Sequence, residues 1–202
     1  TDTVRYVGEP IVAVVANTEN IARNALEAID IEFEALPCVT SLADALATNA
    51  PLLTEAPDNR VAETRYGDAQ ATQAAFDQAA HVVHLDIVNQ RVAALSIEPR
   101  SVLAYPDQGR LHIRMSSQMP TGVRGTVSDL LSIDKEKIRV IVGDVGGGFG
   151  MKTGAYAEDV VTAYCAHTLQ RPVKWIADRS EEFLSSSHGR DIETKASLAL
   201  AS

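Results

Sequence analysis

Four glycines within five positions are the residues with the clearest potential for chemistry: Gly146, Gly147, Gly148 and Gly150. A β-branched run at 138–142 precedes them and predicts a buried strand, and a helical pattern begins near residue 155. A glycine loop between a strand and a helix can bring backbone N–H groups close to an anion, because glycine has no Cβ and tolerates positive φ. We therefore predict an anion-binding loop. The alternative is a tight connection without a ligand, which would need fewer glycines.

The loop nearly matches two nucleotide-binding motifs. In the phosphate loop G-x-x-x-x-G-K-[ST] the lysine follows the last glycine directly, whereas here Met151 separates Gly150 from Lys152. In the dinucleotide motif G-x-G-x-x-G, counted from Gly148, the third glycine position holds Thr153. We therefore disfavour both motifs and keep a nucleotide-binding, phosphoryl-transfer domain as the rival enzyme class.

The composition is that of a soluble globular protein, with 46% hydrophobic and 22% charged residues in a chain of 202. The net charge of −9 argues against nucleic acid or an anionic membrane as a partner. No apolar run approaches the roughly 18 residues of a membrane-spanning helix, so we expect a cytoplasmic protein without membrane insertion. Cys38 and Cys165 lie in apolar settings, which predicts free, buried thiols in a reducing compartment. No C-x-x-C is present, and we predict no metal ligand among the side chains.

The first part of the chain, residues 1–50, has the pattern of a small α/β unit. Its elements alternate in type, with strands expected at 10–16 and 30–36 and helices at 19–29 and 41–47. Residues 51–79 carry prolines and scattered charges, which we interpret as a connecting segment with a short helix at 70–78.

The remaining residues, 80–202, are rich in strand patterns. Residues 101–105 and 110–116 flank a turn of proline, aspartate, glutamine and glycine, which predicts an antiparallel hairpin. The other expected elements are a strand at 81–90 that 91–97 can continue, helices at 118–131, 155–169 and 178–184, and strands at 172–177 and 192–200. The chain starts without methionine and ends in a strand with no closing element, so we expect a fragment or a processed chain.

Four segments, in this order, resemble the large, molybdenum-binding subunit of the xanthine dehydrogenase, aldehyde oxidase and aerobic carbon monoxide dehydrogenase family: 4–13 (VRYVGEPIVA), 97–100 (IEPR), 116–120 (SSQMP) and 144–152 (DVGGGFGMK). The first is similar to the strand that closes the family's α/β hammerhead domain. The likeness continues through 173–175 and 178–181, so it spans nearly the whole chain.

The resemblance implies an α+β fold in three parts. A partial α/β hammerhead unit would occupy 1–50, and the connecting segment 51–79. Residues 80–202 would form the N-terminal part of a mixed α/β molybdopterin-binding domain.

The resemblance also implies roles for particular residues. Gln118 is expected to be catalytic and cofactor-binding, because the family's glutamine hydrogen-bonds an oxo ligand of molybdenum and an amide can do so without titrating. The loop is expected to pass beside the metal centre and to contact the pterin and substrate, with these residues binding cofactor: Gly147, Gly148, Phe149 and Gly150. Phe149 is also expected to be catalytic, because an aromatic face can shape a dry substrate slot.

The roles expected for three charged residues in these motifs are less specific. Lys152 could neutralise the anionic cofactor, which would make it cofactor-binding, or it could be an ordinary first-turn residue, and both readings stay open. Glu98 and Arg100 are expected to form a structural ion pair across the intervening proline.

The implied reaction is hydroxylation of an aldehyde, an N-heterocycle or a carbon monoxide-like substrate with water-derived oxygen. The implied cofactor is molybdenum–molybdopterin, in a dinucleotide form such as the cytosine dinucleotide, with 2Fe–2S and FAD on partner chains or domains. The implied partners are the rest of the large subunit, the iron–sulfur and flavin subunits and a small-molecule substrate.

Two departures from the family limit this reading. The family's catalytic glutamate lies downstream of the sequence, so the isolated chain is expected to be inactive. Thr153 stands where purine-oxidising members carry a glutamate, which argues against xanthine as substrate. A non-catalytic assembly module with the same fold is the non-enzymatic alternative.

Overall fold

The computed structural model describes three stretches of the chain: residues 3–53, 56 and 58–201. Within the predicted connecting segment, residues 54, 55 and 57 therefore lie outside the described part. The chain divides into two compact units. The first comprises Thr1–Glu27 and Val88–Thr194, and the second comprises Ala28–Ile87 and Lys195–Ser202.

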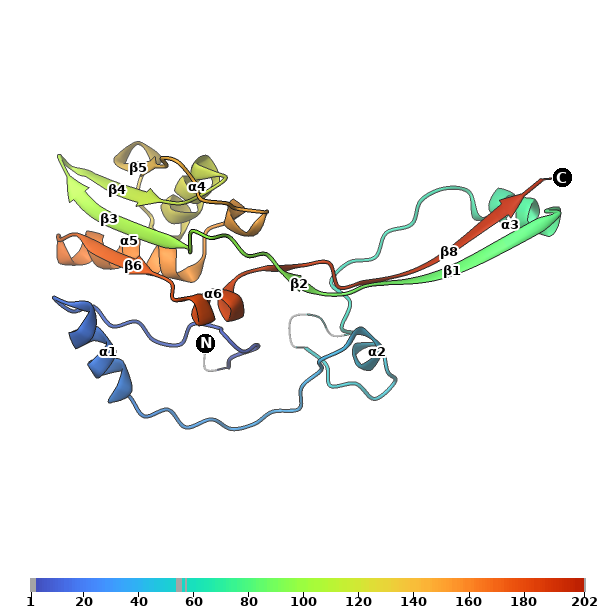
Figure 1. Ribbon diagram of the computed structural model, residues 1–202, viewed down its shortest axis with the longest axis horizontal. Helices are drawn as coiled ribbons and strands as arrows, with labels where there is room; N and C mark the ends of the chain where they lie inside the picture. The colour runs from blue at the N-terminus through green and yellow to red at the C-terminus, as the bar shows by residue number, and fades with distance from the viewer. Residues whose placement is uncertain (1–2, 54–55, 57, 202) are drawn as a thin grey trace. The chain divides into compact units, whose positions relative to one another are not determined.

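The first unit contains a four-stranded sheet in the order β5–β4–β3–β6 (Figure 1). Its strands are β3 (Ser101–Asp107), β4 (Arg110–Met115), β5 (Ile138–Ile141) and β6 (Val173–Ile176). β3 pairs antiparallel with β4 and β6, and β4 pairs parallel with β5. The predicted hairpin is confirmed: its turn residues, Gln108 and Gly109, have φ of 47° and 76°, as a tight two-residue turn requires.

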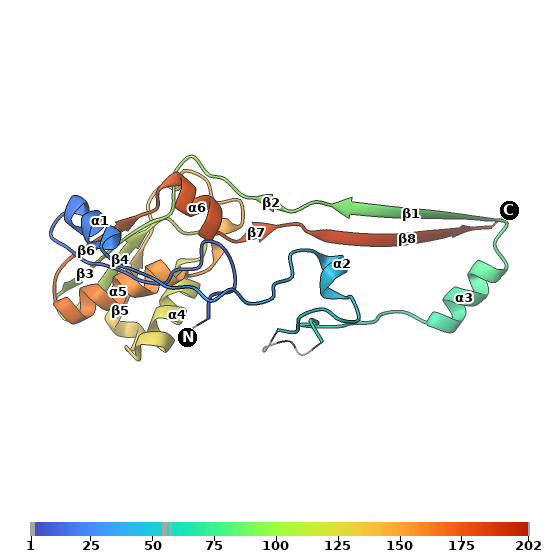
Figure 2. The same cartoon turned by 90° about the horizontal axis from the view of Figure 1, so that it is seen from below.

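Helices α4 (Pro120–Leu131) and α5 (Ala157–Leu169) cover one face of this sheet (Figure 2). Alternate residues of β3 and β4 point to that face and meet small and β-branched residues of the two helices. The buried core consists of Val102, Ala104, Leu111, Ile113, Met115, Val123, Val127, Ile138, Ala163 and Ala166. Because α5 contributes only alanines to this set, it can approach the sheet closely and bury β3 beneath it.

The first unit is completed by short elements: α1 (Glu19–Glu27), β2 (Val92–Ala93), η1 (Lys135–Lys137), η2 (Met151–Thr153), α6 (Arg179–Ser185) and β7 (His188–Gly189). β2 and β7 form a two-residue antiparallel ladder. The carboxylate of Asp178 accepts a hydrogen bond from the Glu181 N–H at 2.8 Å and so caps α6. α6 and η2 both border the candidate site described below.

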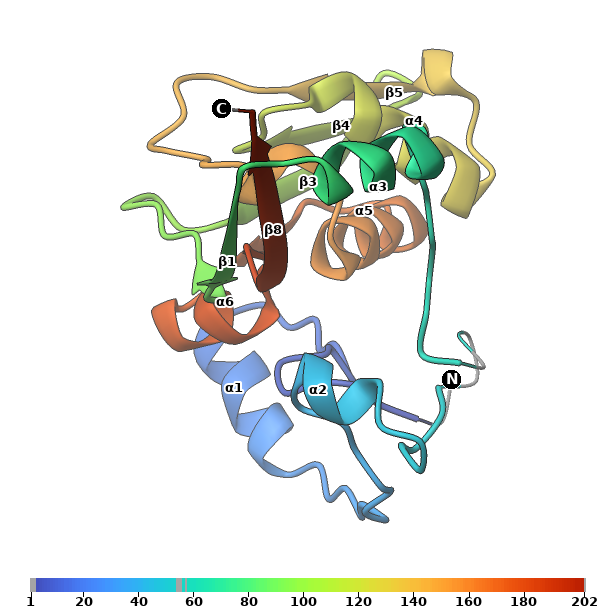
Figure 3. The same cartoon turned by 90° about the vertical axis from the view of Figure 1, so that its right-hand side faces the viewer.

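The second unit contains α2 (Leu42–Ala45) and α3 (Ala69–Asp77). It also holds most of a two-stranded ribbon, β1 (His81–Asn89) and β8 (Ile192–Leu200). The two strands run in opposite directions (Figure 2), and they also lie side by side in the view of Figure 3. None of the helices in the described stretches is both long and apolar enough to cross a bilayer.

The helices and strands predicted between residues 70 and 200 are confirmed with ends within two residues of those expected, apart from the continuation at 91–97, which is reduced to β2. The helices predicted at 19–29 and 41–47 are confirmed as α1 and α2.

The strands predicted at 10–16 and 30–36 are wrong, and no strand forms over 4–13 either. These segments are non-helical and mostly exposed; Ile11 and Phe33, for example, keep 52% and 66% of their surface exposed. The physical reason is that a strand needs the N–H and C=O groups of a neighbour. The described residues provide no neighbour to these segments.

The expected burial of both thiols is also wrong, although both cysteines are free: Cys38 is exposed and Cys165 is half-buried. Cys38 lies just after the segment 30–36, in a part of the chain that forms neither helix nor strand. Cys165 lies on α5 at the flank of the face that buries Ala163 and Ala166.

Candidate functional site

The loop between β5 and η2 has the backbone that its glycines predicted. Gly147 and Gly150 adopt φ of 104° and 86°, a region that residues with a Cβ rarely enter. Phe149 lies between them with φ of 49°, so a bulky residue also has a left-handed backbone. Such strain persists only where the surroundings impose it, and it concentrates at functional sites.

Two other loop glycines are required by close approach. A Cβ at Gly146 would lie 2.5 Å from Cβ of Glu98. A Cβ at Gly148 would lie 2.5 Å from Oε1 of Gln118. The four glycines therefore have specific structural causes, two in backbone conformation and two in packing against Glu98 and Gln118.

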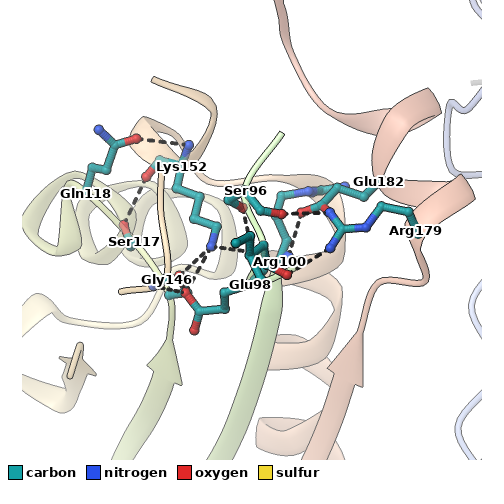
Figure 4. Close-up of polar contacts among 11 residues, drawn as sticks. Ser96, Glu98, Arg100, Ser117, Gln118, Gly146, Lys152, Arg179 and Glu182 are labelled. Carbon is teal, nitrogen blue, oxygen red and sulfur yellow. Dashed lines mark hydrogen bonds and ion pairs between the residues drawn. The ribbon is translucent and has the colours of Figure 1, made fainter. Parts of the chain in front are cut away.

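Gln118 follows β4 and faces the loop (Figure 4). Its Oε1 accepts hydrogen bonds from the backbone N–H groups of Gly150 at 3.0 Å and Lys152 at 3.3 Å. The backbone N–H of Gln118 donates to the Lys152 carbonyl at 2.8 Å. Because both contacts to Oε1 come from donors, the orientation of the amide is determined. Nε2 makes no hydrogen bond to any described residue, so Gln118 offers a free N–H₂ donor.

Phe149 projects from the loop and keeps 73% of its surface exposed. Its ring lies against Gly147, where a Cβ would be 3.0 Å from Cε2 of the ring. The structure therefore places an aromatic ring outside the core and on the same loop that binds Gln118.

Lys152 is buried, with 2% of its surface exposed. Its ammonium donates to Oε2 of Glu98 at 3.1 Å, to the carbonyl of Glu98 at 2.9 Å and to Oγ of Ser116 at 2.8 Å (Figure 4). These contacts use all three ammonium donors. Lys152 is thus not an ordinary exposed first-turn residue, and its charge is directed into the protein.

Glu98 accepts a hydrogen bond from the Gly146 N–H at 2.7 Å and another from Ser116 Oγ at 2.8 Å, besides that of Lys152. Partial burial disfavours its charge. The hydrogen bonds from Ser116, Gly146 and Lys152 outweigh that effect and hold the pKa of the carboxyl below its usual value. Glu98 is therefore a carboxylate that ties the start of the loop to Lys152.

The predicted ion pair between Glu98 and Arg100 is wrong. The chain bends at residues 97 and 98, and the two side chains enter different clusters. Arg100 is buried, contacts Oε1 of Glu158 at 3.3 Å and stacks over the Tyr156 ring at 3.8 Å.

Glu182, on α6, is a buried residue that the sequence reasoning missed. Its carboxylate accepts a hydrogen bond from the backbone N–H of Arg100 at 2.8 Å and another from the Arg179 guanidinium at 2.6 Å. Arg179 also donates to the carbonyls of Ser96 and Ile97, each at 2.8 Å. Segment 96–100, which we call the strap, is therefore held by α6 on one side and by Lys152 on the other. The three-residue spacing of Arg179 and Glu182 on a predicted helix was the available signal.

Asp159 yields a prediction about pH. Burial raises its pKa to about 6, although the Tyr156 N–H donates to it at 2.9 Å and Arg100 is nearby. The folded protein then holds this proton more tightly than the unfolded chain, so the contribution to stability is full below the unfolded pKa and is lost as the pH rises through 6. A change from the ordinary value of 3.8 to about 6 corresponds to about 3 kcal/mol.

We expect Asp159→Asn to remove that pH dependence while keeping an acceptor for the Tyr156 N–H. The measurement is urea unfolding at pH 4 and pH 7, followed by the fluorescence of Trp175, the single tryptophan. Between pH 4 and pH 7 the free energy of unfolding should fall further in the wild type than in the variant. An identical pH dependence in both proteins would refute the assignment.

The site residues fit a ligand of a particular kind. They present an amide donor, a loop without Cβ atoms at its points of closest approach and an exposed aromatic ring. Such a surface suits a ligand with acceptor oxygens and a flat face. A ligand that needs a lysine ammonium from this loop would not fit, because the Lys152 donors are engaged within the protein.

Comparison with known families gives two matches, which residues 38–51 separate. Residues 52–202 match the model of the molybdopterin cofactor-binding domain. Residues 1–37 match the a/b hammerhead domain of aldehyde oxidase and xanthine dehydrogenase.

Individual relatives agree. The chain is 35% identical over 98% of its length to the 6-hydroxypseudooxynicotine dehydrogenase complex subunit gamma of Paenarthrobacter nicotinovorans, of which it covers 25%. It is 32% identical over 98% of its length to the carbon monoxide dehydrogenase large chain of Hydrogenophaga pseudoflava, of which it covers 26%. Among solved structures, quinoline 2-oxidoreductase from Pseudomonas putida 86 matches 92% of the chain with a TM-score of 0.81 and 34% identity, and 24% of that chain is covered.

The chain thus spans about a quarter of the length of these relatives. The cofactor-domain match alone covers well over half of the chain. The chain belongs to the xanthine dehydrogenase and aldehyde oxidase family of molybdopterin-dependent oxidoreductases.

Proposed function

We propose that the chain is part of the catalytic large subunit of a molybdenum hydroxylase and that it forms one wall of the cofactor site. The observation that carries the proposal is the free Nε2 donor of Gln118, oriented by the glycine loop. In an oxidoreductase family that binds molybdopterin, a neutral donor fixed in this way is suited to an anionic oxygen ligand.

Each site residue then has a separate task. Gln118 would donate a hydrogen bond to an oxygen ligand of the metal. Gly147, Gly148 and Gly150 would let the cofactor approach the backbone, and the Phe149 ring would bound the substrate slot and exclude water. Molybdenum–molybdopterin, when bound, supplies the two-electron oxidation.

For Lys152, the geometry supports a positioning role more than the direct cofactor contact considered from the sequence. Its ammonium has no donor left for a cofactor.

For the substrate, we propose an aldehyde, an N-heterocycle or a carbon monoxide-like molecule. The names of the relatives support this range, since they include a quinoline oxidoreductase and a carbon monoxide dehydrogenase. Thr153 argues against xanthine as the substrate, because its hydroxyl donates to the Gly150 carbonyl at 2.8 Å and the position carries no carboxylate.

The remaining cofactors and partners complete the proposal. We propose a dinucleotide form of molybdopterin, 2Fe–2S and FAD on partner chains or domains, and assembly with the rest of the large subunit. One relative is named as a subunit of a complex, which supports such an assembly. By itself the chain is proposed to be inactive, because the family resemblance implies that the catalytic glutamate belongs to another part of the large subunit.

The two alternatives have less support. A phosphoryl-transfer site would need the loop lysine to face the ligand, and Lys152 faces inward. An assembly module without chemistry would have no use for a free Gln118 amide on a strained loop.

The test is Gln118→Ala in the native holoenzyme. We expect turnover to fall by about 100-fold, the usual effect of removing one preorganised donor. Gln118→Glu is the matched comparison, because its carboxylate can still accept from Gly150 and Lys152 but offers no donor, and it should lose turnover similarly. Gln73→Ala, the same change on α3, is the control, because the side-chain amide of Gln73 donates to Asp77 at 2.8 Å and takes no part in the candidate site. Wild-type turnover in both Gln118 variants would contradict the proposal.

A further inference from the structure

We propose that the ion pair of the buried Lys152 with the half-buried Glu98 is a positioning device that sets the orientation of the Gln118 amide and the path of the glycine loop. This inference rests on the proposed function, since it explains how the donor of Gln118 is aimed.

Lys152 couples the pair to Gln118 through its own backbone. Its side chain reaches Glu98 and Ser116, as described above, while its N–H donates to Oε1 of Gln118 and its carbonyl accepts the Gln118 N–H. The Ser117 hydroxyl donates to the same carbonyl at 3.4 Å. Movement of the Lys152 side chain would therefore shift both backbone groups that fix the glutamine.

Glu98 holds the other end of the loop. Its Oε2 accepts the Gly146 N–H, and its own N–H donates to the Gly146 carbonyl at 3.3 Å. The contacts to the pair thus fall at Gly146 and Lys152, on either side of the segment that contains Gly147, Gly148, Phe149 and Gly150 (Figure 4). One ion pair therefore fixes both ends of the loop.

Each charge of the pair needs the other as its counter-ion. Oε2 of Glu98 receives three donors, from Ser116, Gly146 and Lys152, and the Lys152 ammonium meets three oxygens. Removal of either charge leaves the other partly or fully buried without its counter-ion, so the remaining member has to move toward water. Removal of both charges leaves no such demand. The pair therefore predicts non-additive effects.

The experiment compares Glu98→Gln, Lys152→Met and the double variant in the native holoenzyme. The first readout is hydrogen exchange of the backbone amides in peptides that cover residues 144–153. Each single variant should accelerate exchange at Gly146, Gly150 and Lys152 by about tenfold, the equivalent of one lost hydrogen bond. The double variant should exchange no faster than Lys152→Met.

The second readout is kinetic. If the pair positions Gln118, kcat should fall by about tenfold in each single variant with KM little changed, because the loss concerns the transition state rather than substrate binding. The molybdenum content of each preparation is measured so that kcat refers to loaded enzyme. If a single variant does not fold, the double variant should still fold, because it contains no unpaired charge, and a double variant that also fails to fold would overturn the inference.

Unchanged exchange at the three amides, or losses in kcat that simply multiply in the double variant, would overturn the inference. The result is distinguishable from failure of the proposed function. If Gln118→Ala abolishes turnover while the pair variants leave exchange unchanged, the function stands and the positioning role fails. If the exchange changes but Gln118→Ala keeps full turnover, the role of Gln118 fails.

Discussion

Replacing Glu182 by alanine is expected to lower the free energy of unfolding by about 3 kcal/mol. The carboxylate is 1% exposed and joins the Arg100 N–H to the Arg179 guanidinium, which in turn holds the carbonyls of Ser96 and Ile97. The substitution leaves these donors without their acceptor and releases the strap from α6. Urea unfolding followed by Trp175 fluorescence measures the loss in the unit that contains the sheet.

Glu181→Ala is the matched control, because it removes the same chemical group from the preceding position of the same helix. The Glu181 side chain makes no ion pair with a described residue, and burial raises the pKa of its carboxyl despite a hydrogen bond from the Asp178 backbone, so its loss should change the unfolding free energy by less than about 1 kcal/mol. Equal effects of the two substitutions would contradict the role assigned to Glu182.

The substitution Gly148→Ala is expected to reduce turnover of the native holoenzyme by about 100-fold. The added Cβ would lie 2.5 Å from Oε1 and 2.6 Å from Cδ of Gln118, so the glutamine must leave its position between the loop amides. The donor at Nε2 would then no longer point where the cofactor is proposed to lie. Steady-state kinetics, corrected for molybdenum content, measure this effect.

Gly143→Ala separates the clash from the general cost of changing a glycine in this region. A Cβ at Gly143 meets nothing within 4 Å, and its backbone is outside the positive-φ region. We expect this variant to keep turnover within about twofold of wild type. If Gly148→Ala were as active as Gly143→Ala, the packing of Gln118 against the loop would have no functional importance.

The parts of the fold that the sequence predicted are those defined by local pattern. The alternation at 110–116 and the turn glycine Gly109 specify the hairpin, and Asp178 specifies the start of α6. The strands at 10–16 and 30–36 failed for a different reason. An apolar run indicates a tendency toward burial, but a strand also needs a neighbouring strand whose N–H and C=O groups form hydrogen bonds with its own.

The site shows the same division between local and distant information. The glycine loop was singled out from its own pattern and Gln118 from the resemblance to a family, and the structure brings them into direct contact. The partner of Lys152 was not predictable, because Glu98 lies 54 positions earlier in the chain. Arg100, a basic residue two positions from Glu98, was the more obvious partner for that carboxylate. Glu182 lies 82 positions from Arg100, so only the fold could reveal that contact.

The most direct test of the account is the molybdenum content of the native protein that carries this chain, measured by mass spectrometry of metals in wild type and in Gln118→Ala. We expect close to one molybdenum per chain in wild type, together with oxidoreductase activity that the variant largely loses. A native protein that contains no molybdenum, or one whose molybdenum and turnover are indifferent to Gln118, would contradict the central claim.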